Sequence, residues 1–194
     1  TLISGATLTL NASTVTSTSS GNLILSAARF VNNAGSGALS VTGGGNWQVW
    51  SSNASPFDAN AAVADSRGGL SFNYKQYNAI YGSSTVLGTG NGFLYSYAPT
   101  LTASLTGTVT KTYDRLTTAT LVSGNYSLSG TVDSDVVVLN NPSSGNYTSQ
   151  GSGLGIKDVG TGKTVSVSGI SISSALNSGE TVYGYTVNSS ASAN

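Results

Sequence analysis

Short runs in which apolar residues alternate with Thr, Ser or Gln recur along the first fifty residues, separated by Gly, Asn and Ser. Such alternation is typical of half-buried strands. The near-regular spacing of Leu8, Leu23 and Leu39 is typical of a solenoid, whose coils stack strand on strand around one apolar interior. We therefore predict the last coils of a right-handed parallel β-helix, with an antiparallel meander as the alternative. The predicted strands are residues 7–10, 22–26, 38–41 and 47–50.

Aromatic residues are concentrated after these runs. The end of a solenoid exposes unpaired backbone and an open interior, which bulky side chains must cover. We expect an aromatic-rich cap made of Trp47, Trp50, Phe72, Tyr74, Tyr77, Tyr81, Phe93, Tyr95 and Tyr97. Residues 56–69 have the one helical texture in the chain and are predicted to form a short helix or a long loop.

Trp47 and Trp50 are three positions apart, so on an extended strand they are expected to point to opposite faces. One then lies in the interior. The other is either covered by the loop 56–69, with Phe57 at hand, or exposed as a platform on which a sugar ring stacks. In the second case the candidate glycan contacts are Trp47, Trp50, Tyr95 and Tyr97.

The second half of the chain has a different texture, and Pro99 marks the change. Leu105, Val109 and Tyr113 fall at even spacing, with Thr filling alternate positions, which predicts the first strand of a hairpin whose second strand is residues 117–122. We predict two domains, residues 1–99 and 100–194. The second is expected to be a small Ig-like β-sandwich, with a β-grasp-like fold as the alternative, and its further strands are 126–131, 135–140, 163–173 and 181–188.

The segment 110–114, Thr-Lys-Thr-Tyr-Asp, resembles the start of the YDG/MBG-type repeat modules of large secreted bacterial adhesins of the filamentous-haemagglutinin kind. The similarity covers about residues 101–194. Residues 43–53 and 72–82 resemble the segment that closes the β-helix in such exoproteins. The family usually has Gly after Tyr-Asp, where this chain has Arg115. The corner is therefore expected to change turn type or to carry a strain of roughly 1 kcal/mol.

Composition excludes several classes of function. The chain has zero formal net charge and only 7% charged residues, so it presents no basic field for nucleic acid. It has no Cys and no His, which removes disulfides, thiolate metal sites and the usual general base. No apolar run approaches the roughly 20 residues that span a bilayer. We expect no enzyme activity, no cofactor, no metal site and no membrane insertion.

Four further motifs have a chemical interpretation and a simpler one. Residues 160–164, Gly-Thr-Gly-Lys-Thr, lack the earlier Gly of a phosphate loop. Asp133 and Asp135 are predicted to be solvated turn acids. Lys111 and Lys163 are candidates for an intramolecular isopeptide bond with an Asn, which needs a buried acid beside the pair, for which Glu180 or Asp114 is available. The Thr rank in 106–112 resembles ice-binding solenoids, although ordinary β-propensity explains it.

The resemblance implies a fragment of a secreted, cell-surface adhesin. We expect a non-catalytic stalk or spacer that contacts host cells, matrix or biofilm polysaccharide, with a lectin-like glycan-binding module as the alternative and an ice-binding β-solenoid as a remote one. An outer-membrane transporter of a two-partner secretion system is the expected partner of the full-length protein.

Overall fold

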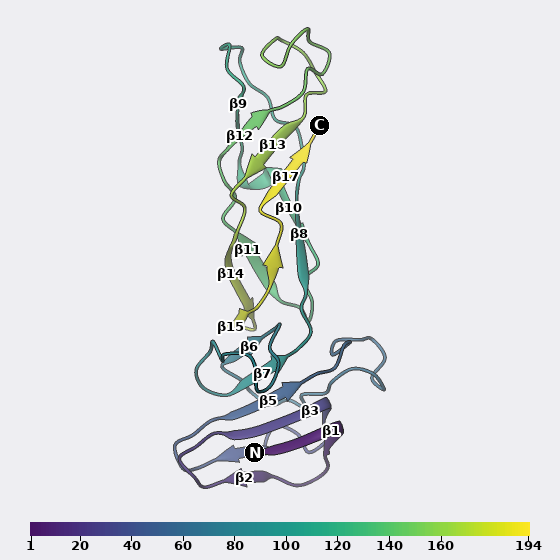
Figure 1. Ribbon diagram of the computed structural model, residues 1–194, viewed down its shortest axis with the longest axis vertical. Coiled ribbons are helices and arrows are strands. Elements are labelled where there is room, and N and C mark those ends of the chain that lie inside the picture. The colour runs from purple at the N-terminus through teal and green to yellow at the C-terminus, as the bar shows by residue number, and fades with distance from the viewer. The chain divides into compact units, whose positions relative to one another are not determined.

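The computed structural model describes residues 1–194 and is all-β, with 41% of residues in strands and 2% in helix. It contains no helix long and apolar enough to cross a membrane. The chain forms two compact units (Figure 1). Unit 1 contains Thr1–Pro99, Val132–Val136 and Ala175–Tyr185, and unit 2 contains the remaining residues. Two segments from the second half of the sequence thus belong to unit 1. The division into independent domains at residues 1–99 and 100–194 stays a prediction.

Unit 1 begins with successive strands that pair in parallel. β1 (Leu2–Leu10), β3 (Leu23–Asn32) and β5 (Trp47–Ser51) lie side by side in one sheet. The short strands β2 (Val15–Ser17) and β4 (Leu39–Val41) form a second parallel pair. All four runs predicted as strands in this region are strands, and the parallel pairing excludes an antiparallel meander.

The register differs from the one that the leucine spacing predicted. Leu23 pairs with Trp47 and Val15 with Leu39, in both cases 24 positions apart. Leu8 lies beside Phe30 rather than Leu23. The leucine spacing does not report the coil repeat, because Leu23 lies in β3 and Leu39 in β4, and these strands belong to different sheets.

The sheet of unit 1 continues with strands that are not consecutive in sequence. β7 (Gly92–Tyr95) pairs in parallel with β5, and β6 (Tyr74–Gln76) pairs in parallel with β7. β15 (Glu180–Tyr183) then pairs in parallel with β6, and antiparallel with the end of β14 (Ile172–Asn177). A strand from the second half of the chain therefore joins the sheet begun by the first residues, and β14 and β11 follow it in the strand order.

The expected aromatic cluster is present in unit 1. Phe93 is 1% exposed and contacts the rings of Phe30, Trp47 and Phe72. Trp50 is also buried, and its ring lies edge-on to Tyr81 at 5.5 Å between centroids. Both tryptophans are therefore covered, but Tyr81 covers Trp50 where Phe57 was expected.

Residues 56–69 form turns without a helix. Side chains hold this loop to β3: Arg29 donates hydrogen bonds to the carbonyl oxygens of Ala61 (2.6 Å) and Ala64 (2.8 Å). Asp65 accepts the backbone N–H of Phe30 at 3.1 Å. Phe57 extends from the loop and packs edge-on against Tyr95, with 5.0 Å between ring centroids.

A charged cluster lies inside unit 1. Lys75 on β6 is fully buried, and its Nζ lies 2.6 Å from Asp133 Oδ2 and 2.5 Å from Asp135 Oδ1. Arg67 also pairs with Asp133, at 2.7 Å. Tyr77 Oη donates to Asp135 Oδ2 at 2.6 Å. The cluster thus balances two cations with two carboxylates, as burial of charge requires.

The prediction that Asp133 and Asp135 are solvated was wrong. Asp133 and Ser134 have φ values of 54° and 58°, and the N–H of Asp135 donates to the carbonyl of Val132 at 2.9 Å. Two positive φ values in a hydrogen-bonded turn of this kind are typical of type I′. The turn itself was predicted, but its acids face the interior of unit 1.

Unit 2 contains two sheets, one of three strands and one of four. β8 (Thr100–Leu105) pairs with β10 (Tyr126–Ser129), which follows a single 3-10 turn at Ser123–Asn125, and β8 also pairs in parallel with β16 (Thr186–Val187). The second sheet has the order β17-β13-β12-β9. Its strands are β9 (Thr118–Thr120), β12 (Ser144–Tyr147), β13 (Val165–Ser168) and β17 (Ser190–Ala193). β11 (Val136–Leu139) supplies Leu139 to the core.

One apolar core holds unit 2 together. Its buried members come from both sheets, from β11 and from the adjoining turns: Ala103, Ala119, Leu121, Leu139, Val165, Val167 and Ile170. These side chains are small, so partly buried residues such as Tyr126, Tyr147 and Leu105 complete the packing. The predicted hairpin of residues 105–115 and 117–122 was wrong, because β8 ends at Leu105 and residues 106–117 form no strand.

Candidate functional site: a pocket in unit 2

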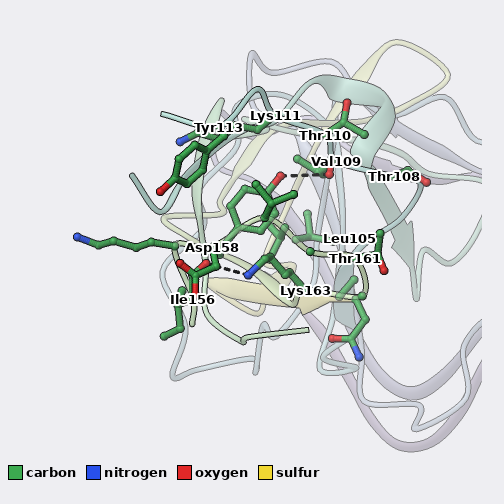
Figure 2. A pocket seen from close by; sticks show the side chains of 18 of the residues that line it. Leu105, Thr108, Val109, Thr110, Lys111, Tyr113, Ile156, Asp158, Thr161 and Lys163 are labelled. Atoms are coloured by element: carbon green, nitrogen blue, oxygen red, sulfur yellow. Dashed lines mark hydrogen bonds between the residues drawn. The ribbon is translucent and has the colours of Figure 1, made fainter. Parts of the chain in front are cut away.

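The segment 106–117 leaves the end of β8 and forms one wall of a cavity of about 400 Å³. Residues 156–163, from the Gly-rich loop before β13, form another wall. Tyr147 of β12 and Val165 of β13 line it from the second sheet. Figure 2 shows Val109 and Leu105 beside Thr108 and Thr161, so apolar and hydroxyl groups are mixed along the lining. The volume lies within the range of small-molecule sites.

Local hydrogen bonds fix the first wall. Tyr147 Oη donates to the carbonyl oxygen of Val109 at 3.1 Å. Lys111 Nζ donates to the carbonyl oxygens of Leu116 (3.2 Å) and Thr118 (2.9 Å), and it pairs with Asp114 at 2.8 Å. The hydrogen bond from Lys111 lowers the pKa of Asp114, which is therefore ionised at neutral pH.

Lys163 fixes the second wall. Its Nζ donates to the carbonyl oxygens of Gln150 (2.9 Å), Gly155 (3.0 Å) and Ile156 (3.0 Å). An ammonium has three donors, and here three carbonyl groups use them. The Gly160–Thr164 segment therefore uses its lysine to close a loop, in a geometry unlike that of a phosphate loop.

The rim of the pocket is apolar where it meets solvent. Tyr113 is 55% exposed, and Val159 and Leu116 are exposed as well. A concave surface with exposed apolar groups beside Thr hydroxyls can hold a small ligand with an apolar face and hydroxyl groups, as a sugar ring has. Asp114, one of the carboxylates that line the pocket, already forms an ion pair with Lys111.

The structure places the residues predicted to contact glycans in the interior of unit 1. Trp47, Trp50 and Tyr95 are 3%, 5% and 2% exposed, and Tyr97 is half-buried against Phe57. Trp47, Trp50 and Tyr95 are thus too deeply buried to offer a stacking surface in the folded chain, whereas Tyr97 stays partly exposed. Sequence reasoning missed the pocket residues Tyr147, Ile156 and Val159. The sequence feature that could have indicated the pocket is a Gly-rich loop that contains apolar residues but lacks strand periodicity.

The two lysines proposed for an isopeptide bond are also accounted for. Lys111 and Lys163 each bond backbone carbonyl groups, as described above, and neither donates to an Asn side chain. Of the two candidate acids, Asp114 pairs with Lys111 on the surface, and Glu180 forms no ion pair.

Comparison with known proteins gives one finding. A family model described as the YDG domain matches residues 97–193. No curated protein and no solved structure matches the chain. The matched residues include all of unit 2 except Asn194. They therefore include every residue that lines the pocket, again except Asn194. Because they make up half of the sequence, the chain belongs to the YDG-domain family.

Proposed function

We propose that the chain is a non-catalytic part of a secreted bacterial surface adhesin and acts as a stalk or spacer. In this proposal unit 1 is the end of a right-handed parallel β-helix with an aromatic cap, and unit 2 is an Ig-like sandwich. The full-length protein reaches the cell surface through an outer-membrane transporter. The presence of a YDG domain supports the proposal, as does the neutral surface rich in Ser and Thr.

The observation that carries the proposal is the parallel stacking in unit 1. β1, β3 and β5 pair in parallel, and β2 and β4 repeat the arrangement in a second sheet. Stacked coils of this kind contact only their neighbours, so they extend in one direction and suit a spacer. β1 lies at one edge of its sheet, whereas the aromatic cluster lies over β5 and β7. Further coils of the parent protein are proposed to pair with the free edge of β1.

A pulling experiment on single molecules tests the spacer function. The chain is held between two marker domains of known unfolding force, and its unfolding force and its resistance to protease are measured. A spacer is expected to unfold at forces at or above those of the markers and to survive protease with cuts restricted to exposed loops. Unfolding well below the markers, or rapid digestion within strands β3 and β5, would contradict the proposal.

The pocket of unit 2 supports a second candidate function, glycan binding by a lectin-like module. The exposed ring of Tyr113 stands beside Thr hydroxyls at the pocket rim. The test is a glycan array probed with the wild-type chain and with Tyr113→Ala. The matched control is Leu154→Ala, because Leu154 is 93% exposed and lies outside the pocket lining. Binding that Tyr113→Ala removes and Leu154→Ala keeps supports a lectin. If the wild-type chain binds no glycan on the array, the spacer is the one candidate function that remains.

A further inference from the structure

The buried cluster of unit 1 brings a lysine, an aspartate and an asparagine together. Lys75 is 0% exposed, and its Nζ lies 2.5 Å from Oδ1 of Asp135. Asn177, at the end of β14, is 7% exposed and donates from Nδ2 to the same oxygen at 2.7 Å. One carboxylate oxygen therefore bridges the lysine ammonium and the asparagine amide.

We propose that Lys75 and Asn177 form an intramolecular isopeptide bond, with Asp135 transferring the protons. The cluster supplies the three groups that this reaction needs: an amine as nucleophile, an amide carbonyl as electrophile and a carboxylate as base. The side chains of Lys75 and Asp135 are both 0% exposed, so bulk water does not reach the reacting groups. The bond is therefore protected from hydrolysis once it has formed.

The asparagine is the better electrophile in this cluster. Oδ2 of Asp135 accepts hydrogen bonds from Tyr77 at 2.6 Å and from Tyr185 at 2.8 Å, and Oδ1 accepts from Lys75 and Asn177. Both oxygens of this carboxylate are therefore occupied as acceptors, and the carbon of a carboxylate resists attack by an amine. Burial raises the pKa of Tyr77 and of Tyr185, so both phenols stay protonated and keep donating.

The orientation of the Asn177 amide also fits. Its Nδ2 donates to the backbone carbonyl of Asp133 at 2.7 Å as well as to Asp135. The opposite orientation would place an amide oxygen against two acceptor oxygens, so the hydrogen-bond network fixes the assignment. The leaving nitrogen thus already faces the group that delivers its proton.

The reaction balances without an oxidant or a second reactant. The carboxylate of Asp135 takes one proton from the Lys75 ammonium, and the resulting amine attacks Cγ of Asn177. A C–N bond to Lys75 forms, and the bond from Cγ to Nδ2 breaks. Asp135 delivers its proton to Nδ2, which leaves as ammonia, and takes the second proton that the attacking nitrogen loses. Asp135 therefore ends protonated, so no uncompensated carboxylate remains after the lysine has lost its charge.

The bond would join β6 to the end of β14 and close a loop of about a hundred residues, which gives a chain without cysteine a covalent link of the kind that a disulfide provides. It would fasten the segment Ala175–Tyr185 to the segment that contains β6, within unit 1. This proposal does not depend on the adhesin function proposed above.

Intact-mass measurement of the purified full-length chain tests the proposal. After folding and overnight incubation, the mass is expected to be lower than the calculated value by one ammonia, about 17 Da. Trypsin is then expected to leave Lys75 uncut and to release residues 68–111 linked to residues 164–194. A mass equal to the calculated value would overturn the proposal.

Two other outcomes would also overturn the proposal. The first is a loss of 17 Da without the linked peptide, which indicates a cyclic imide at an asparagine. The second is a loss of water with residues 116–157 in the linked peptide, because the acceptor would then be an aspartate. Lys75→Arg and Asn177→Ala are expected to have their full calculated masses. Lys163→Arg is the matched lysine control and is expected to keep the loss of ammonia. Because the wild-type mass is decisive, the test does not depend on how well the variants fold.

Discussion

At the scale of single residues, the sequence predicted an unusual backbone conformation in one turn, where a residue with a Cβ atom occupies a position that usually holds Gly. Arg115 stands where related modules usually have Gly, and strain or a changed turn type was expected. The structure gives Arg115 a φ of 66°, which confirms the strained alternative. Asp114 stabilises the same turn by accepting the N–H of Leu116 at 2.9 Å.

Replacing Arg115 with Gly should stabilise unit 2. Gly adopts a positive φ without the steric strain of Arg, so Arg115→Gly is expected to raise the free energy of unfolding by about 0.5–1 kcal/mol. The greater conformational entropy of Gly in the unfolded chain offsets part of this gain. Urea unfolding of both proteins measures the difference. Arg115→Ala is the control, because it removes the same side chain and keeps the Cβ atom. If Ala stabilises as much as Gly, the side chain and not the backbone is responsible.

Asp65 should make the stability of unit 1 depend on pH. Burial raises the pKa of its carboxyl group, and Oδ2 has no hydrogen-bond partner. A pKa that is higher in the folded state favours folding at low pH, so this contribution is lost as the pH rises through the folded pKa. Asp65→Asn has no such titration. The difference in unfolding free energy, variant minus wild type, is therefore expected to increase between about pH 3 and neutral pH. A difference independent of pH would contradict this.

At the scale of elements, alternation predicted strands well where both faces of the strand pack, as in β3 and β5. It failed for residues 106–117, where Val109 and Tyr113 have the spacing of a strand but line a pocket instead. Thr-rich alternation indicates a preference for extended backbone and does not say whether a neighbouring strand is present. No strand was predicted after residue 188, yet Ser190–Ala193 form β17, which pairs with β13 over four residues. Their Ser and Ala content hid the strand.

Asn188 is expected to be essential for the position of β16 and β17 beside β8. Its side chain accepts the N–H of Ala103 at 2.7 Å and donates to the carbonyl of Ala103 at 2.9 Å, so it replaces a missing pair of backbone hydrogen bonds. Asn188→Ala leaves both groups of a buried residue unpaired, which should cost about 1–3 kcal/mol. Thermal unfolding measures the loss. Ser190→Ala, at an exposed position of β17, is the control and should change stability by less than about 0.5 kcal/mol.

At the scale of the whole molecule, the sequence predicted the change of texture at Pro99 but not the return of the chain to unit 1. Nothing in the segments 132–136 and 175–185 marks them as partners of residues 1–99. Local pattern predicts a solvated turn at Asp133 and Asp135, because their partner, Lys75, is about sixty positions away and the pattern contains no information about such pairing. The pocket was missed for the same reason, since its walls come from separate loops.

The return of the chain makes a prediction about residues 1–99 expressed alone. This fragment lacks β15, which pairs with β6, and it lacks both carboxylates that bind Lys75. An unpaired buried charge costs about 3–5 kcal/mol, a large part of the 5–15 kcal/mol that stabilises an ordinary domain. We therefore expect exchange protection of amide hydrogens to be retained in β3 and lost in β6.

Replacing Lys75 with Met separates this explanation from a general loss of structure. In the full chain, Lys75→Met removes both the ion pair with Asp135 and the proposed bond to Asn177, so it should lower the free energy of unfolding by several kcal/mol. In the fragment 1–99 the same substitution removes a charge that has no partner, so it should raise stability and restore part of the protection of β6. Chemical denaturation of the four proteins gives both differences. Opposite signs are expected because one side chain is paired in the full chain and unpaired in the fragment. Destabilisation in both would mean that Lys75 stabilises unit 1 through its aliphatic packing and not through the two aspartates.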